Sequence, residues 1–177
     1  MIEIGSRREL FVDDYLIESL SGAHKRLHQP VAREVVLHLN RPWEGNTCAY
    51  AVVFRDGDVF RMYYRGSHWD WDAMRGTHEV ACYAESTDGS EWVRPVLGLC
   101  DFAGSTANNI IWAGEGAHNF TPFKDTNPGC SPQARYKAIA SIEGGIITFA
   151  SPDGLRWSVT SQLLQASESS KRTGRGM

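Results

Sequence analysis

The most constraining feature of the sequence is a seven-residue motif that occurs twice. Residues 86–92 and 151–157 both read Ser-x-Asp-Gly-x-x-Trp, and the second copy begins 65 residues after the first. The Asp-Gly pair supplies the positive φ angle of a tight turn, and each copy follows a strand-length run of apolar and β-branched residues. A repeat at this spacing indicates that one structural unit occurs twice in succession.

Each unit is predicted to contain four short strands. The clearest hairpin flanks Asp56 and Gly57, and helical periodicity is nearly absent from the chain. In the motif, the Ser and Asp side chains are expected to hydrogen-bond the turn while the Trp packs between sheets. The predicted strands are residues 51–54, 59–64, 80–85 and 92–96 in the first unit, and 120–123, 135–140, 145–150 and a strand after the motif in the second.

Repeated four-stranded antiparallel units are the blades of β-propellers. The sequence therefore predicts an all-β fold, a partial β-propeller with blades at about residues 47–97 and 117–164 and an N-terminal strand before them. The incomplete propeller domain is assigned to residues 1–164. Residues 165–177 show no alternation, so we predict a disordered tail there. Two blades leave open sheet edges, through which we expect the chain to self-associate.

Composition and charge exclude several classes of function. A net charge of −3 and a pI near 6.1 provide no broad basic surface, so we do not expect a nucleic-acid partner. The sequence has no apolar stretch of membrane-spanning length and no signal-peptide core, which predicts a cytoplasmic protein without a membrane partner. The four cysteines form no Cys-x-x-Cys pair, which favours free thiols and predicts neither a metal site nor another cofactor.

A second signal lies in several stretches of the sequence, which are LFVDDYLI at 10–17, His28, Pro30, PWE at 42–44, CYAESTDGSEW at 82–92, NNI at 108–110, RYKAIAS at 135–141 and ASPDGLRW at 150–157. Together they resemble bacterial proteins that are similar to the N-terminal domain of family 32 glycoside hydrolases, up to about Leu164. The resemblance implies a five-bladed β-propeller of the superfamily that includes families 32, 43 and 68, with about three further blades after these two. It also implies a glycosidase that hydrolyses O-glycosidic bonds of poly- or oligosaccharides with paired carboxylates.

The sequence departs from these families where their chemistry is carried. Alignment with the family 43 pattern places Tyr50 where the catalytic Asp of that family stands. The family 32 motifs Asn-Asp-Pro-Asn and Arg-Asp-Pro do not occur in the sequence. The resemblance therefore supports the fold better than it supports the chemistry.

The candidate site lies where neighbouring blades present the same ends of their strands. Successive strands of a blade run in opposite directions, so the start of the first strand and the connection between the second and third share one face. That connection, residues 66–78, is predicted to be a long loop rich in Trp and Asp, a usual place for binding. The catalytic candidates are Glu44 and Asp14, and the substrate-binding candidates are Asn46, Tyr50, Trp69, Asp70, Asp72, His118 and Asn119.

Several candidates also have a structural interpretation. Glu44 is then a solvated loop carboxylate, His118 a hydrogen-bond partner of the neighbouring blade, and Asp14 a turn former. Asp125 is excluded, because it follows the first strand of its blade and lies on the opposite face. Two alternatives to glycoside hydrolysis stay open, which are a carbohydrate-binding or structural propeller without catalysis and a fragment without function.

Overall fold

A computed structural model describes residues 3–164 and divides the chain at Glu34 into two units, each described by itself. Residues 3–34 contain turns but no helix or strand, so the predicted N-terminal strand is wrong. Tyr15 N donates to Asp13 Oδ1 and Ile17 N to the Asp14 carbonyl, both at 3.0 Å. These backbone groups are satisfied within their own turn instead of by a neighbouring strand. The predicted tail, residues 165–177, lies outside the described residues.

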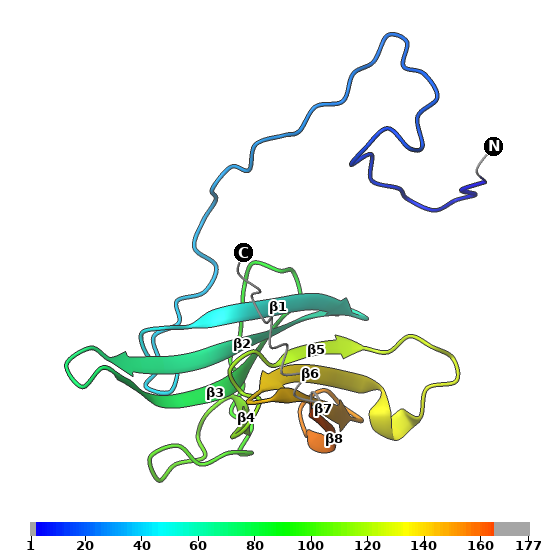
Figure 1. Cartoon of the computed structure of the whole chain (residues 1–177). Coiled ribbons are helices and arrows are strands. Elements are labelled where there is room, and N and C mark those ends of the chain that lie inside the picture. The colour runs from blue at the N-terminus through cyan, green and yellow to red at the C-terminus, as the bar shows by residue number, and fades with distance from the viewer. Residues whose placement is uncertain (1–2, 165–177) are drawn as a thin grey trace, which may run out of the picture. The chain divides into compact units, whose positions relative to one another are not determined.

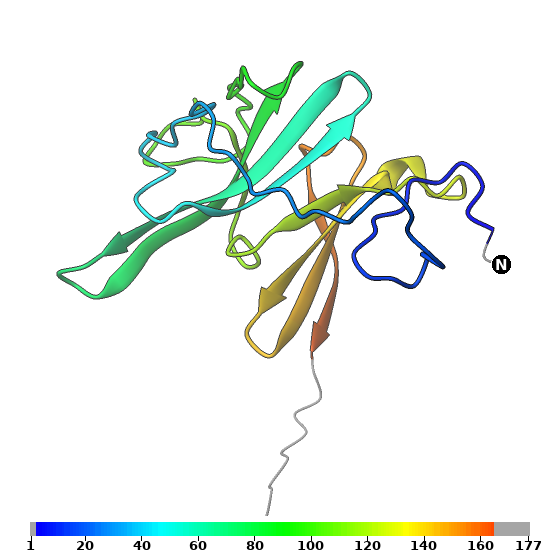
Figure 2. The same ribbon diagram turned by 90° about the horizontal axis from the view of Figure 1, so that it is seen from above.

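Residues 35–164 contain two four-stranded antiparallel sheets, in each of which the strands follow their order in the sequence (Figures 1 and 2). The first sheet consists of β1 (Ala49–Asp56), β2 (Val59–Asp70), β3 (Arg75–Ser86) and β4 (Ile110–Ala113). The second consists of β5 (Thr121–Lys124), β6 (Tyr136–Ile142), β7 (Gly145–Ser151) and β8 (Ser158–Leu164), with the short 3-10 turn η1 (Pro132–Ala134) before β6. The predicted all-β fold class is confirmed, with two four-stranded units of a partial propeller that do not close into a ring.

Tight turns form where the sequence places glycine. Asp56 pairs with Val59, so two residues make the first hairpin loop, and Gly57 has φ +64 there. Both copies of the repeated motif form the same turn, in which the Ser Oγ accepts the Gly N–H at 2.8 Å. In both copies the Trp Nε1 also donates to the Gly carbonyl, at 3.0 and 3.1 Å. The turn therefore forms as predicted in both copies. Trp157 packs between the two sheets as predicted, whereas Trp92 packs on the other face of the first sheet, so the predicted packing between sheets is wrong for Trp92.

The connection between β2 and β3 differs from the prediction. The two strands stay paired as far as Asp70 and Arg75, so residues 71–74 alone form the turn and the predicted loop at 66–78 is wrong. Asp70 Oδ1 accepts the N–H groups of Asp72 and Ala73, each at 3.0 Å, which stabilises the turn. Residues 68–70 on the β2 side of the tip are half-buried and residues 75–77 on the β3 side are exposed, so this hairpin lacks apolar alternation.

The fourth strand of the first sheet is also not where the sequence predicts it. Residues 92–96 contribute a single bridge, from Val93 to Glu85, whereas β4 pairs with β3 over Val80 to Cys82. The bridge and β4 lie along the same edge of β3, and residues 94–108 leave that edge between them. Proline cannot donate to a sheet ladder, so Pro95 interrupts the pairing directly after the bridge. The first sheet therefore ends at Ala113 and not near residue 97.

The main apolar core lies between the two sheets. Side chains of a strand alternate between its faces, and alternate residues of β6 and β7 point into this core. The core residues are Tyr63, Ala81, Tyr83 and Ile111 of the first sheet, Tyr136, Ala138, Ala140, Ile147 and Phe149 of the second, and Phe120 and Trp157 beside it. A smaller core on the other face of the first sheet contains Tyr64, Val80, Cys82, Ala84 and Ile110. Burial of these apolar groups is the main force that holds the sheets together.

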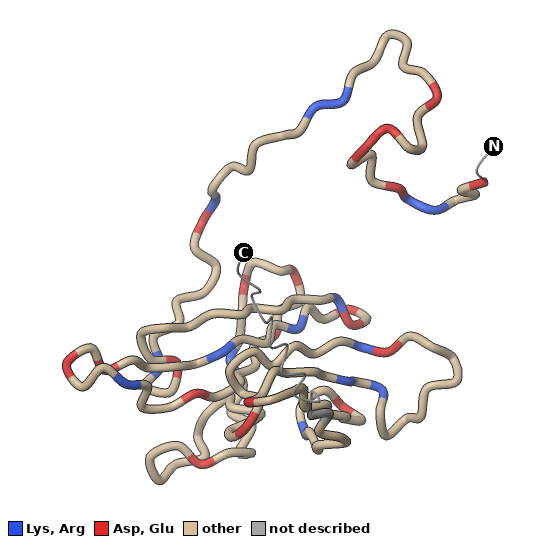
Figure 3. Tube along the Cα trace, in the orientation of Figure 1, with Lys and Arg blue, Asp and Glu red and all other residues tan. Residues whose placement is uncertain are grey.

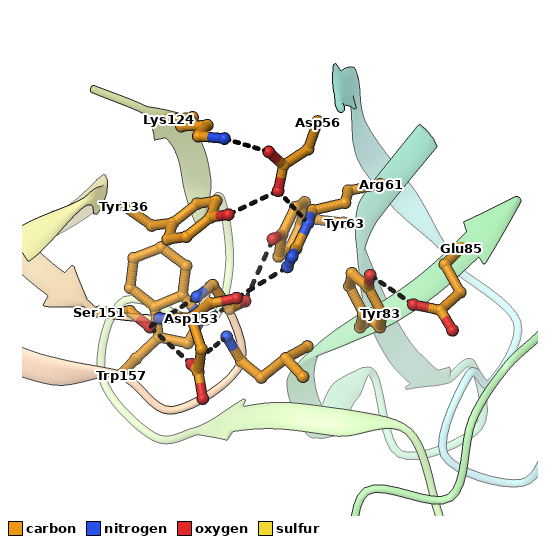
Figure 4. Close-up of polar contacts among 12 residues, drawn as sticks. Asp56, Arg61, Tyr63, Tyr83, Glu85, Lys124, Tyr136, Ser151, Asp153 and Trp157 are labelled. Atoms are coloured by element: carbon orange, nitrogen blue, oxygen red, sulfur yellow. Dashed lines mark hydrogen bonds and ion pairs between the residues drawn. The ribbon is translucent and has the colours of Figure 1, made fainter. Parts of the chain in front are cut away.

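A charged group joins the sheets at one end of the main core (Figure 4). The Asp56 side chain is 7% exposed and forms ion pairs with Arg61, at 2.7 Å, and with Lys124. It also accepts a hydrogen bond from Tyr136 Oη at 2.5 Å. These partners compensate the charge of a carboxylate that is nearly buried. Elsewhere along the described residues, acidic and basic residues are interspersed (Figure 3).

The second turn motif docks on β2 beside this group (Figure 4). Arg61 Nη1 donates to the Asp153 carbonyl at 2.8 Å, and Tyr63 Oη donates to the Gly154 carbonyl at 3.1 Å. Gly154 has φ +78, and a Cβ at this position would lie 2.8 Å from Arg61 Nη1. Glycine therefore permits both the turn and its close approach to the first sheet.

Acid is expected to weaken this junction. Burial raises the pKa of Asp56, but hydrogen bonds from Lys124 and Tyr136 outweigh burial and leave that pKa below its ordinary value. Burial also raises the pKa of Asp153, whereas backbone N–H groups of its own turn lower it to about 2. A lowered folded-state pKa contributes stability above the unfolded pKa, and this stability is lost as the pH falls through the folded pKa. The free energy of unfolding should thus stay level down to about pH 4 and fall between about pH 4 and about pH 2.

Urea denaturation at a series of pH values measures this dependence. Asp153→Asn keeps an oxygen that can accept the turn hydrogen bonds but removes the titrating group, so its acid dependence should be smaller than that of the parent protein. Asp58→Asn is the matched control, because the Asp58 side chain is fully exposed at the first hairpin loop. Equal acid dependence in the parent protein and in Asp153→Asn would contradict the prediction.

Candidate functional site

Tyr50 occupies a strained position at the start of β1. Its φ is +55, in the left-handed region that bulky residues rarely adopt, and the register of β1 with β2 shifts between Ala49 and Val52. The residue is 52% exposed. Such backbone strain costs about 1–3 kcal/mol and is often found at functional sites. The bulge therefore marks this end of β1 as a candidate site.

Tyr50 meets His118, which lies in the segment that leads into β5. The two ring centroids are 5.4 Å apart, and Tyr50 Oη lies 3.5 Å from His118 Nε2. His118 Nδ1 lies 2.8 Å from Glu79 Oε1 on β3. The structure thus brings together two predicted binding residues, from the first sheet and from the approach to the second.

Arg65 on β2 completes this group, which we call the Tyr50 cluster (Tyr50, Arg65, Glu79 and His118). The guanidinium lies over the Tyr50 ring at 4.9 Å, and its Nη1 lies 3.6 Å from Glu79 Oε1 and 3.2 Å from His118 Nε2. If the His118 Nδ1–H donates a hydrogen bond to Glu79, the unprotonated Nε2 can accept hydrogen bonds from Arg65 and Tyr50. The hydrogen-bond network thus assigns the tautomer with the proton on Nδ1. Arg65 Nε is buried and has no hydrogen-bond partner among residues 3–164, so the site retains an unused donor.

Glu44, the predicted catalytic carboxylate, lies in a closed network. It is 0% exposed, and Arg94 Nη1 lies 3.0 and 2.8 Å from its two carboxylate oxygens. Tyr64 Oη and Arg41 N donate to the same oxygens at 2.6 and 2.7 Å. The interpretation as a solvated loop carboxylate is therefore wrong, since the geometry gives Glu44 the role of holding residues 41–44 against the first sheet. A catalytic role for Glu44 stays a prediction.

A pocket of about 160 Å³ lies beside this network, and Trp43, Arg94 and Asn109 contribute to its lining. Its polar groups already have partners within the protein. Asn109 Nδ2 donates to Tyr64 Oη and to the Tyr83 carbonyl at 2.8 and 2.6 Å, and its Oδ1 accepts from Trp43 Nε1 at 2.7 Å. This pocket therefore offers a ligand fewer free polar groups than the Tyr50 cluster does.

Two predicted binding amides hold connections in place. Asn46 Nδ2 donates to the Trp69 carbonyl at 3.0 Å, and its Oδ1 accepts the Trp69 N–H at 2.8 Å. Asn119 bonds both the side chain and the main chain of Ser141: its Nδ2 donates to the Ser141 Oγ at 2.6 Å, and its Oδ1 accepts the Ser141 N–H at 2.9 Å. Both amides thus shape the surroundings of the Tyr50 cluster, and a direct contact of either with substrate stays a prediction.

The remaining predicted residues lie at the tip of the β2–β3 hairpin or in the other unit. The rings of Trp69 and Trp71 pack edge to face, with their centroids 6.2 Å apart, and Trp71 is 67% exposed. Asp72 is exposed in the turn that Asp70 stabilises. Asp14 belongs to residues 3–34 and forms an ion pair with Lys25 at 2.5 Å.

Arg65 and Glu79 are not among the site residues predicted from the sequence. Arg65 follows the apolar run of β2, and Glu79 precedes the apolar run of β3, so the two flank the stretch predicted as a loop. Opposite charges at the two ends of one connection were the available signal. They pointed to a site only after the strands were known to pair, which places Arg65 opposite Ala81 and Glu79 opposite Ser67.

Comparison with known proteins adds neither a family nor a relative, since no protein-family model matches the sequence and no curated protein matches it either. Across the described residues, no helix is long and apolar enough to cross a membrane. In the same part of the chain, no group of three His, Cys, Asp or Glu side chains is placed to hold a metal ion. The cysteines are free, and burial raises the pKa of the Cys82 thiol well above its ordinary value, which makes it unreactive.

Proposed function

We propose that this chain is a carbohydrate-binding β-propeller module whose Tyr50 cluster contacts the sugar. The observation that carries the proposal is the strained φ of Tyr50, which holds a half-exposed aromatic ring beside Arg65 and His118. Sugars present apolar C–H faces that stack on aromatic rings, and hydroxyl groups that form strong hydrogen bonds with charged side chains. The cluster offers both kinds of contact within one group of side chains.

The aromatic hairpin tip extends this surface along the same strands. Trp69 lies four residues beyond Arg65 on β2, which is about 13 Å at the usual rise of a strand. Trp71 follows in the turn and is exposed. A ligand that touches both Tyr50 and the tip has to be an extended chain. We therefore propose an oligosaccharide as the ligand, in agreement with the resemblance to family 32 glycoside hydrolases.

Hydrolysis of O-glycosidic bonds is the second candidate function, and the position of Glu79 favours it. The Glu79 side chain is 40% exposed and lies 2.8 Å from His118 Nδ1. Glycosidases use two carboxyl groups about 5 to 9.5 Å apart, and the Tyr50 cluster supplies one of them. Glu44 is enclosed by its own partners. Binding without turnover is for these reasons the first proposal.

Calorimetric titration with plant and microbial oligosaccharides tests the proposal. We expect the parent protein to bind a member of this panel, and Tyr50→Ala to weaken binding at least tenfold, about 1.4 kcal/mol, because the stacking ring is lost. Tyr15→Ala removes an exposed tyrosine from residues 3–34 and serves as the matched control with unchanged affinity. Near-ultraviolet circular dichroism checks that both variants keep the parent fold.

The same mixtures are then analysed for released reducing sugar. Intact oligosaccharide after binding supports the binding module. Release of sugar that is abolished in Glu79→Gln supports the second candidate instead. Equal affinity of Tyr50→Ala and the parent protein would remove the Tyr50 cluster from the site, and lack of binding across the panel would overturn the proposal.

A further inference from the structure

The first sheet holds the second through a surface that recurs elsewhere in the chain. On the first sheet this surface consists of Phe54, Tyr63 and the ion pair of Asp56 with Arg61. Its polar groups bond the carbonyls of the turn at residues 151–157 (Figure 4). The occupant of the surface is thus a sheet that presents the repeated turn motif.

The second sheet carries the same surface in the same register. Phe54 on β1 pairs with Arg61 on β2, and Arg61 pairs with the residue of β3 that precedes the first motif. Phe123 on β5 pairs with Lys137 on β6, and Lys137 pairs with the residue of β7 that precedes the second motif. Phe123 and Lys137 therefore take the places of Phe54 and Arg61.

The ion pair recurs as well. Asp125 directly follows β5 and pairs with Lys137 at 2.5 Å, just as Asp56 at the end of β1 pairs with Arg61 at 2.7 Å. The Lys137 side chain is 40% exposed, compared with 18% for Arg61. The cation on the second sheet is thus more accessible to a partner than the cation that already binds the second motif.

Within residues 35–164, the surface on the second sheet is uncovered, unlike its counterpart. Tyr63 is 0% exposed, whereas Phe123 and Ile139 are each 48% exposed and Ile146 is 39% exposed. Lys137 and Ile139 alternate along β6 with buried alanines, so they lie on the face directed away from the main core. Apolar side chains gathered beside a charged pair are typical of an interaction surface.

The chain also contains a second copy of the occupant. The turn at residues 86–92 repeats the docked turn, but its Asp88 and Ser90 are exposed. The Gly89 carbonyl accepts only the Trp92 Nε1 hydrogen bond within residues 3–164, and the Asp88 carbonyl accepts none there. In the docked turn, the corresponding two carbonyls are bonded by Arg61 and Tyr63.

We propose that this chain associates head to tail with a second copy of itself. The turn at residues 86–92 of one copy docks on Phe123, Lys137 and Ile139 of the other, and Lys137 donates to the Asp88 carbonyl of the turn. The contact joins a sheet face to a turn and does not pair open sheet edges. Because the two surfaces differ, every added copy leaves one turn and one face free, so the assembly grows with concentration.

The contact is weaker than the one inside the chain. Ile139 stands where the first sheet has Tyr63, so the hydrogen bond that Tyr63 Oη makes to the Gly154 carbonyl has no counterpart. The sheet face behind the turn at residues 86–92 is already buried under Leu37, Leu39, Trp43 and Phe102, so the turn makes the contact without that face. A small contact of this kind corresponds to a dissociation constant on the order of micromolar.

Sedimentation velocity between about 1 and about 200 µM protein tests the proposal, since mass action populates a micromolar complex within this range. The mean mass of the parent protein is expected to rise with concentration. Ile139→Asp places a charge in the face, and Ser90→Lys places a long cation in the turn opposite Lys137, so each variant should stay monomeric. Met74→Asp makes the same apolar-to-acidic change at the exposed hairpin tip and should associate like the parent protein.

Mixing the two variants distinguishes head-to-tail docking from other modes. Ile139→Asp retains an intact turn, and Ser90→Lys retains an intact face, so their mixture should form dimers and nothing larger. Association of Ser90→Lys alone would mean that the face pairs with itself and would overturn the proposal. Monomeric parent protein at every concentration, or unchanged association of Ile139→Asp, would overturn it equally.

Discussion

Replacing Arg94 by methionine is expected to lower the free energy of unfolding by about 3–5 kcal/mol. The Arg94 Nη1 lies 2.8 Å from Glu44 Oε2, and the two side chains are 15% and 0% exposed. Methionine keeps much of the apolar stem but removes the charge, which leaves the Glu44 carboxylate buried without its cation. Urea denaturation followed by tryptophan fluorescence measures the loss.

Two further variants separate the ion pair from a general effect of the substitution. Arg75→Met changes an exposed arginine in the β2–β3 hairpin and should alter stability by less than about 0.5 kcal/mol. Glu44→Gln combined with Arg94→Met should recover part of the loss, because no charge is then left buried. A loss below about 1 kcal/mol in Arg94→Met, the range of an exposed pair, would contradict the closed network.

Replacing Trp157 by alanine is expected to lower the free energy of unfolding by a similar amount, about 3–5 kcal/mol. Trp157 is 8% exposed. Its ring packs edge-on against Tyr63 of the first sheet and against Phe120, with ring centroids 6.4 and 5.0 Å apart. Alanine leaves a cavity where the two sheets meet. Because the Tyr50 cluster depends on docked sheets, oligosaccharide affinity should fall in the same variant.

Trp92 provides the matched comparison within the same protein. It occupies the same position in the first motif and makes the same hydrogen bond to its turn, but it is only partly buried, on the far face of the first sheet. Trp92→Ala should therefore cost roughly half as much stability or less, in proportion to the smaller apolar area removed from water. Equal losses for the two variants, measured by urea denaturation, would contradict a special role of Trp157 at the sheet junction.

The sequence predicted part of the candidate site. Tyr50 was predicted from its alignment with the catalytic Asp of family 43, and His118 from its place at the start of the second unit. The structure brings the two into contact. Arg65 and Glu79 were not predicted, because strand residues reveal a shared site only through pairing between strands. Glu44 was predicted at the site, but burial with Arg94 removes it from solvent. The local sequence at residues 41–44 contains no sign of this burial.

The fold was predicted more completely than the site. Its errors fall on strands that lack the alternation of apolar and polar residues. Seven of the eight strand positions follow from apolar runs beside Asp-Gly or other glycine turns. The paired hairpin at residues 66–78 was missed because these residues, half-buried on the β2 side and exposed on the β3 side of the tip, show no apolar alternation. The strand at residues 110–113 was misplaced, because residues 94–108 interrupt the edge between Val93 and β4.

By itself, the sequence determined the two turn motifs, the strands that flank them and their repetition, because turn geometry and side-chain alternation depend on residues adjacent in the chain. Only the tertiary structure decided which carboxylate is enclosed and which aromatic ring meets a histidine. Glu44 and Arg94 are 50 residues apart, and Tyr50 and His118 are 68 apart. Burial and charge pairing across such separations depend on how the two sheets dock, and no local pattern records that.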